Sequence, residues 1–400
     1  MSIEILTASI LSKMPGVGKW QVKFFVHLVL LWVRLRGRYN FENMARQGNL
    51  NVWTYRQNFS KTFDFEQFNT HLYGHLGDER ILVFDPCFIN KSGKHTEGLN
   101  RFWSGCAGKM KKGLEIGGFA LVDVNHHTAF HYYAHQTMLA DKEPPLDYYT
   151  KLVKEKSANL QELSGYLVVD AFFSKKTFIN PVCETGLEVV TRLRDDAALR
   201  YRYLGPRLKK RGKPRLYAGK LDPQNPDLSY FRVCVKEQNW VAYEAVLHAK
   251  ALKRWVKVVL VHYFDEDKKF KSHKLFISTD MAMTGMDLLL YYHLRFQIEF
   301  LYRDGKQFLG LNHCQSRNKK RLHFHFNFVL TMCSLLKLTY WLPQVKEKGE
   351  KIPFSVQNIK NEAQNEFLLE RFIDVFGVCP QTPKYNHKLK ELREYAKIAA

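Results

Sequence analysis

The chain has 400 residues, of which 46% are hydrophobic and 14% aromatic, so it can bury a sizeable core and is not a disordered tail. Its 61 lysines and arginines, against 39 aspartates and glutamates, give a formal net charge of +22. Such a charge attracts polyanions and indicates nucleic acid as a partner. A membrane surface is disfavoured, because the basic residues are spread along the whole chain and not gathered beside an apolar anchor.

Three features predict a cytoplasmic protein. The apolar stretch from Phe24 to Val33 is shorter than the ~20 residues that a spanning helix needs, so we expect a core helix there. No small-residue cleavage site follows a basic amino end, which leaves secretion unsupported. The cysteines are odd in number and form no CxxC pair, a pattern that favours a reducing compartment over a zinc site.

Residues 1–76 are predicted to form a helical domain. An apolar-periodic segment runs from Val22 to Leu35, and a break at Asn49 to Asn51 separates two further helical stretches. Helix, short turn, helix is the outline of a helix-turn-helix, whose second helix would offer Arg56 and Lys61 to DNA. Small helical pairs often serve packing alone, so the two interpretations stand as equals.

Residues 77–190 change to a pattern of strands with one helix. Short apolar runs that end in Asp85 and in Asp170 predict two strands buried on both faces. Alternating segments on either side of the turn Asn125 to Thr128 predict a hairpin, and a helix is expected from Pro144 to Leu163. Strands followed by a helix and another buried strand indicate an α/β or mixed sheet.

The remaining chain divides into three predicted parts. Alternating segments separated by Gly, Pro and Asp turns make residues 191–279 a β-rich insertion, residues 280–342 return to helix as the second part of the core, and residues 343–400 form a charged helical tail with a basic end. The basic runs Arg207 to Arg215 and Arg317 to Arg321 either follow DNA phosphates or are merely solvated.

Four residues of the second core part stand at the spacing YxxRxxxExxxxxxK: Tyr292, Arg295, Glu299 and Lys306. At about 100° per residue, one continuous helix would place all four on a face roughly 60° wide, opposite an apolar back. The alternative is a solvated charged stripe on an amphipathic helix, which any helical surface can show.

Asp85 and Asp170 add two carboxylates to Glu299. Acids at the ends of neighbouring strands converge at the mouth of an open α/β sheet, although a turn or cap aspartate is as common after a strand. Three converging carboxylates repel one another, so such a cluster usually holds divalent cations, here Mg²⁺ or Mn²⁺. Two such ions can activate a water or a 3′ hydroxyl and stabilise the leaving oxygen of a phosphodiester. Of the other acids, Asp304 is the one expected near these metals.

On these residues the chain resembles the DDE transposases of bacterial insertion sequences, in the branch marked by the YREK signature. The order of the acids matches, and the interval from Asp170 to Glu299 has room for the β insertion of that branch. The stretch FINKSGKHTEG after Asp85 is similar to a segment of related transposases, and we expect its Lys91, Lys94 and His95 to contact DNA. Pro86 departs from the pattern, where a small hydroxyl residue is common.

The resemblance implies a ribonuclease H-like core and a catalytic triad of Asp85, Asp170 and Glu299 that holds two ions. It implies that the signature Tyr292 and Arg295 contact the DNA ends, including a base flipped beside a hairpin intermediate. A tryptophan of the insertion would help to stack that base, and Trp255 and Trp240 are the candidates.

The sequence therefore predicts a transposase that binds the inverted-repeat ends of an insertion sequence, cuts the DNA with Mg²⁺ or Mn²⁺ and joins the 3′ ends to target DNA. Lys306 is expected to hold phosphates beside the metals. Double-stranded DNA is the predicted partner, a homodimer the working complex and the bacterial nucleoid the place of action. The alternatives are an inactive or domesticated DNA-binding regulator, and a ribonuclease H-like nuclease without strand transfer.

Overall fold

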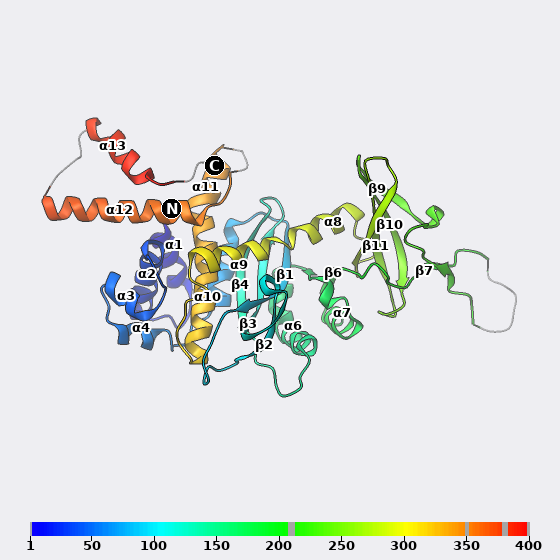
Figure 1. Cartoon of the computed structure of the whole chain (residues 1–400), viewed down its shortest axis with the longest axis horizontal. Coiled ribbons are helices and arrows are strands. Elements are labelled where there is room, and N and C mark those ends of the chain that lie inside the picture. The colour runs from blue at the N-terminus through cyan, green and yellow to red at the C-terminus, as the bar shows by residue number, and fades with distance from the viewer. Residues whose placement is uncertain (1, 207–212, 349–351, 378–382, 398–400) are drawn as a thin grey trace.

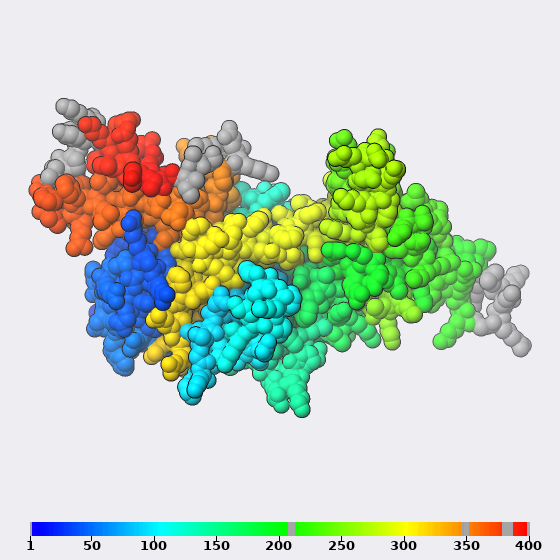
Figure 2. Space-filling model, in the orientation of Figure 1, coloured from blue at the N-terminus to red at the C-terminus, as the bar shows by residue number. Residues whose placement is uncertain are grey.

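The computed structural model describes residues 2–206, 213–348, 352–377 and 383–397. The molecule is elongated (Figure 1), with helices of both chain ends gathered on one side and the strands of the insertion extending from the other. Figure 2 shows the same division on the surface, where the blue and orange-to-red segments lie at one end and the green strands project at the opposite end.

Five helices precede the sheet: α1 (Ile3–Lys13), α2 (Lys19–Arg34), α3 (Phe41–Gln47), α4 (Val52–Asn58) and α5 (Phe65–Leu72). Polar side chains cap the first turns of α3 and α4, since Asn40 accepts from the N–H of Asn43 and Asn51 from that of Thr54. The predicted helix, turn, helix outline is confirmed as α3 and α4, and α1 lies in the predicted helical domain, ahead of the first helix that the sequence delimited. Trp32 of α2 is fully buried and donates to the carbonyl of Leu309 at 3.1 Å, which ties these helices to the core.

The central strands run in the order β4 (Thr128–Gln136), β3 (Lys109–Asp123), β1 (Arg80–Ile89), β5 (Tyr166–Val168) and β6 (Glu188–Arg192). β4, β3 and β1 pair antiparallel, whereas β1, β5 and β6 pair parallel. This arrangement confirms the predicted ribonuclease H-like mixed sheet and the hairpin of β3 and β4. β2 (Asn100–Ser104) extends the sheet beside β3.

Helices cover both faces of the central strands. A Cβ on Gly117 of β3 would meet Tyr149, which belongs to α6 (Pro145–Gln161). A Cβ on the next residue, Gly118, would instead meet Tyr302 of α9 (Gln297–Phe308) on the opposite face. The helix α7 (Lys176–Cys183) packs against α6, and α10 (Lys319–Leu336) lies along β4. The apolar strands are therefore buried on both faces, as their sequences predicted.

The insertion continues the central sheet and does not form a separate layer. Its strands are β7 (Leu199–Arg202), β8 (Tyr217–Lys220), β9 (Arg232–Lys236), β10 (Trp240–Ala249), β11 (Arg254–Phe264) and β12 (Phe270–Ser278). β12 pairs antiparallel with β6, so the described part of the chain contains a single 12-stranded sheet. The helix α8 (Gly285–Leu294) crosses this extension and leads back to the core.

The carboxyl-terminal segment is helical and returns to the amino-terminal helices. It contains a π-helix (Lys337–Trp341), α11 (Leu342–Lys348), α12 (Val356–Phe376) and α13 (Pro383–Glu394). Lys360 of α12 donates to the carbonyl of Leu35 at 2.9 Å, at the end of α2. The helical part of the tail was predicted, but its contact with the first helices was not.

The composition predicted reduced cysteines and no membrane-spanning helix, and both expectations can be compared with the described residues. Six of the cysteines lie there, and all six are free thiols, whereas Cys379 lies outside them. In the ranges that the structure describes, no helix is long and apolar enough to cross a membrane.

Buried histidines make the fold sensitive to acid. The His131 ring contacts the amide oxygen of Asn327 at 3.1 Å, and the His325 ring contacts the carbonyl of Gly310 at 2.9 Å. Burial lowers the pKa of His131 to about 3 and that of His325 to about 4, from an ordinary value of 6.5. A histidine with a depressed pKa favours the neutral folded state, so its stabilisation is complete above about pH 6.5 and is lost as the pH falls toward 4.

We expect the free energy of unfolding to fall between pH 6.5 and pH 4 by up to about 1.4 kcal/mol per pH unit for each such histidine. Urea unfolding at several pH values measures this slope. His131→Gln removes one titrating group and flattens the slope, whereas His95→Gln, at an exposed position, leaves it unchanged. Equal slopes for His131→Gln and the wild type would contradict this account.

Candidate active site

Three carboxylates meet at one end of the central strands. Asp85 lies in β1, and Asp170 follows β5 two residues after Val168. Because β1 and β5 are parallel with Val83 paired to Val168, the two aspartates stand at the same level of the sheet. Glu299 comes from the first turn of α9, where the positive end of the helix favours a negative side chain.

The guanidinium of Arg295 lies between these acids. Its Nη1 is 3.7 Å from Oδ1 of Asp85, and its Nη2 is 3.0 Å from Oε1 of Glu299. Arg295 is only 6% exposed and the Asp85 side chain 17%, so their contact forms in a largely water-excluded place, whereas the Glu299 side chain is 44% exposed. The sequence placed Arg295 on the same helical face as Glu299, but it assigned Arg295 to DNA and not to the acids.

The charges of the cluster are unbalanced. Burial raises the pKa of Asp85 to about 8, and the nearby Asp170 and Glu299 add to this rise while Arg295 opposes it. Burial also raises the pKa of Asp170, again against the effect of Arg295. For Arg295 itself, burial lowers the pKa, but the surrounding groups, Asp85 foremost, hold it above its usual range. One guanidinium thus does not compensate three carboxylates, and a further cation would stabilise their charged forms.

The predicted single helix through the signature is wrong. α8 ends at Leu294, and α9 begins at Gln297 after a tight turn. In the turn, the N–H of Arg295 donates to the carbonyl of Tyr292 at 3.3 Å, three residues back and not four. Helical periodicity cannot reveal such a break because each half keeps a helical pattern of its own.

Tyr292 and Lys306 nevertheless lie on the side of the carboxylates. The Tyr292 ring packs on Phe276 of β12, with 4.9 Å between centroids, and the Arg295 guanidinium lies 5.8 Å from its centre. Lys306 lies beside Cys87, two residues beyond Asp85 on the same face of β1. Burial raises the pKa of Cys87 to about 11, although Lys306 lowers it.

Sequence reasoning missed Tyr302, which is 5% exposed and bonded to the backbone of an aspartate of the cluster. Its hydroxyl donates to the backbone carbonyl of Asp85 at 2.7 Å. Gly118 is paired with Asp85 across the strands, and a Cβ there would come within 2.0 Å of that hydroxyl. The available signals were the position of Tyr302 three residues after Glu299 and the GlyGly pair of β3.

We expect Gly118→Ala to displace Tyr302, since the new methyl group would occupy the place of its hydroxyl. The substitution should lower the free energy of unfolding by about 1–3 kcal/mol, as overpacking of a core does. Thermal unfolding measures this loss. The double variant Gly118→Ala with Tyr302→Phe relieves the clash and should be more stable than Gly118→Ala alone, and a smaller or equal stability would contradict the proposed contact.

Sequence comparison assigns this core to a family. A family model described as the transposase DDE domain matches residues 78–336, which is more than half of the chain. The chain belongs to this transposase family. No curated protein matches the transposase.

Among solved structures, the transposase is similar to a piggyBac transposase in a cryo-EM synaptic complex with hairpin DNA. The sequence identity is 14%, 98% of this chain and 74% of that chain are covered, and the TM-score is 0.37.

The other predicted DNA contacts of the transposase lie away from the carboxylates. Arg56 lies in α4, and Lys61 follows that helix. Lys91 donates to the carbonyl of Cys314, and two neighbours share an exposed loop, namely Lys94 and His95. Of the basic run from residue 207 to 215, residues 207–212 lie outside the described part of the chain.

Neither tryptophan of the insertion stands beside the carboxylates. Trp255 packs against Tyr217 and His248, with ring centroids 6.0 and 5.3 Å away. Trp240 lines a cavity of about 390 Å³ together with His293 of α8. The insertion therefore offers two separated aromatic sites, and Trp240 is the one beside the helix that carries Tyr292.

The expectation for Asp304 is wrong. Asp304 is 5% exposed and pairs with Arg303 at 3.1 Å. Burial raises its pKa, and Arg303 and the buried Lys337 of the π-helix oppose that rise. Asp304 thus points to the side of α9 that packs toward the carboxyl-terminal helices, because five residues along a helix change the direction of the side chain by more than a quarter turn.

The donor set of the candidate site fits a hard divalent cation. All three side chains offer carboxylate oxygens, which Mg²⁺ prefers, and a cation would relieve the raised pKa values of Asp85 and Asp170. Within the described residues, no three His, Cys, Asp or Glu side chains already stand close enough to hold a metal. The positive charge between Asp85 and Glu299 belongs to Arg295 in this conformation.

Proposed function

We propose that this transposase binds the inverted-repeat ends of an insertion sequence, cuts the DNA there and joins the freed 3′ ends to target DNA. One observation carries the proposal: Asp85, Asp170 and Glu299, which lie far apart in the sequence, are gathered around Arg295 at one end of the central strands. Membership of the transposase family supports the same chemistry.

Asp85, Asp170 and Glu299 are the proposed ligands of two divalent ions, Mg²⁺ or Mn²⁺. Bound there, such ions supply an activated water or hydroxyl and neutralise the charge that develops on the phosphate. The carboxylates hold the ions in place. Tyr302 orients β1 through its hydrogen bond to the backbone of Asp85.

The signature side chains are proposed to position the DNA. Lys306 stands beside Cys87 on the strand of Asp85, where its ammonium can hold a phosphate of the strand being cut. Tyr292 offers a ring next to Asp170, and Trp240 lines a cavity together with Leu289 and His293 of α8, so both can contact a displaced base. These proposed roles support an assignment to the YREK branch, and the net charge of +22 suits a bacterial protein that works on DNA in the nucleoid.

The function is tested with labelled DNA that carries the candidate inverted repeats flanking the gene. Wild-type protein should cleave at the repeat ends with Mg²⁺ or Mn²⁺ and join the product to a second DNA, and should yield no product in excess chelator. Tight metal-independent binding without any product would replace this proposal by a regulator, and cleavage without joining would replace it by a plain nuclease. Since two ends are joined together, the complex with end DNA should have the mass of a protein dimer.

A further inference from the structure

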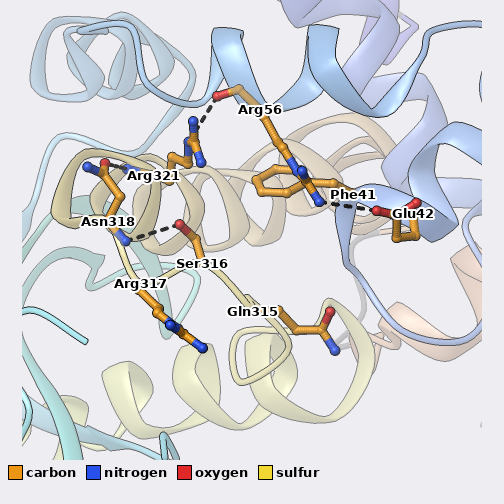
Figure 3. Close-up of a pocket in the computed structure, with 8 residues that line it drawn as sticks. All are labelled: Phe41, Glu42, Arg56, Gln315, Ser316, Arg317, Asn318 and Arg321. Atoms are coloured by element: carbon orange, nitrogen blue, oxygen red, sulfur yellow. Dashed lines mark hydrogen bonds and ion pairs between the residues drawn. The ribbon is translucent and has the colours of Figure 1, made fainter. Parts of the chain in front are cut away.

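A pocket of about 370 Å³ lies between the amino-terminal helices and the loop that leads into α10. From one side it is lined by α3 and α4, with Glu42 and Arg56. From the other side it is lined by residues 315–318 and by Arg321 in the first turn of α10. Two basic segments that are far apart in the sequence therefore meet in one hollow (Figure 3).

Arg321 holds the two walls together. Its Nε donates to the carbonyl of Arg56 at 3.1 Å and to the hydroxyl of Ser60 at 2.8 Å. The side chain of Asn318 caps α10 by accepting from the N–H of Arg321 at 3.3 Å, so the end of that helix already has a partner. The position of Arg56 over the pocket is thus set by a contact with the catalytic core and not by α4 alone.

Two guanidinium groups in this pocket remain available to a ligand. Arg317 is exposed, and its side chain has no ion pair or hydrogen bond with any described residue. Arg56 pairs with Glu42 at 3.1 Å, but their side chains are 43% and 54% exposed. An ion pair of such exposure contributes only about 0.2–1 kcal/mol, so an anion of higher charge density can replace the Glu42 carboxylate. Three arginines face one glutamate here, which leaves the pocket positive.

The pocket is connected to the strand of the first candidate carboxylate. Lys91, two residues after β1, donates to the carbonyl of Cys314 in the loop before Arg317. Burial lowers the pKa of Lys91, and the Arg317 guanidinium lowers it further, which places the two cations near each other. The N–H of Glu97 donates to the carbonyl of Arg317 at 3.3 Å, so the whole segment after β1 lies against this loop. Basic groups thus continue from the end of β1 to α4.

We propose that this pocket binds a phosphate of the DNA backbone, with Arg56 and Arg317 as its ligands and Arg321 as the residue that positions them. The inference rests on the proposed function in that the ligand is DNA. A guanidinium presents paired N–H donors that match two phosphate oxygens, and backbone contacts of this kind set the register of a protein on DNA without reading its sequence. The site would therefore bind duplex DNA that passes from the carboxylates to the amino-terminal helices.

The test measures binding of a labelled duplex of random sequence by fluorescence anisotropy over a range of salt concentrations. Each lost phosphate contact reduces the slope of log Kobs against log salt by about 0.9. Because both arginines hold the same phosphate, Arg56→Gln with Arg317→Gln should make the slope shallower by about 0.9 and raise the Kd about tenfold near 0.1 M salt. The control, Arg371→Gln with Lys390→Gln, removes the same charge from exposed positions of α12 and α13 and should change the slope little.

Glu42→Gln should change the DNA affinity in the opposite direction. Removing the carboxylate that competes for Arg56 should tighten DNA binding several-fold, and more than Glu162→Gln does, which removes an exposed carboxylate at the end of α6. A purely structural role of the Arg56 and Glu42 pair predicts no such gain. Thermal unfolding of every variant shows whether it is folded. Arg317→Gln alone changes a side chain that has no partner among the described residues, so it gives an answer should the double variant unfold.

The outcome does not depend on DNA cleavage. The phosphate-binding proposal would be wrong if the double variant kept the slope and Kd of the wild type, or if its loss of affinity were no larger than that of the charge-matched control. This holds even if the protein cleaves its end DNA. If the double variant has a reduced salt slope but the wild-type protein shows no cleavage, the phosphate-binding proposal is supported. Only the proposed transposition reaction is then rejected.

Discussion

Glu299→Gln is expected to lower the rate of DNA cleavage at least about 10³-fold, which corresponds to about 4 kcal/mol of lost transition-state stabilisation. Glutamine keeps the shape of the side chain but removes the negative charge that a divalent ion requires. The Glu299 side chain is 44% exposed, so the substitution should leave the fold intact. DNA binding should be unchanged or slightly tighter, because one negative charge is removed from the site.

Cleavage of end DNA and binding of the same DNA are therefore measured in parallel. Glu370→Gln, an identical change at an exposed position of α12, serves as the matched control and should cleave like the wild type. Equal cleavage by Glu299→Gln and the wild type would remove Glu299 from the mechanism. Loss of both binding and cleavage in a folded variant would assign Glu299 to DNA contact instead.

Arg295→Gln is expected to lower the free energy of unfolding by about 1–3 kcal/mol between about pH 9 and pH 10, because Asp85, whose pKa is raised to about 8, is ionised there in the folded protein. The guanidinium is 6% exposed, and the side chain of its partner Asp85 is 17% exposed, so its removal strands a buried carboxylate next to Asp170. The contact of Arg295 with the more exposed Glu299 should contribute little to this loss. Urea unfolding gives the difference in free energy directly.

A double-mutant cycle shows whether the loss comes from the stranded charge. Arg295→Gln with Asp85→Asn removes both partners and should recover about 1–3 kcal/mol relative to the sum of the single changes. The exposed pair of Arg194 and Asp196, with side chains 72% and 71% exposed and 3.0 Å apart, is the reference cycle and should show coupling near zero. Additive losses at Arg295 and Asp85 would contradict the electrostatic account of the cluster.

The sequence by itself determined the features that depend on local pattern. Apolar runs that end in Asp85 and Asp170 predicted two buried strands because continuous hydrophobicity is typical of a strand covered on both faces. Alternation with period two predicted the hairpin of β3 and β4. The spacing of Tyr292, Arg295 and Glu299 pointed to the transposase family, whose model matches residues 78–336. Each of these signals lies within a short stretch of chain, where residue order and spatial neighbourhood coincide.

Only the tertiary structure decided how distant residues meet. Arg295, in the turn between α8 and α9, contacts Asp85, a residue more than half the chain away. The spacing of the signature residues cannot reveal this contact, because Asp85 lies outside the signature. The pairing of β12 with β6 joins the insertion to the central sheet, although composition alone allowed a separate layer. The pocket of Arg56 and Arg317 likewise exists only because α4 is held against the start of α10. Such contacts depend on which buried surfaces fit together, and that is a property of the whole packed core and not of any one segment.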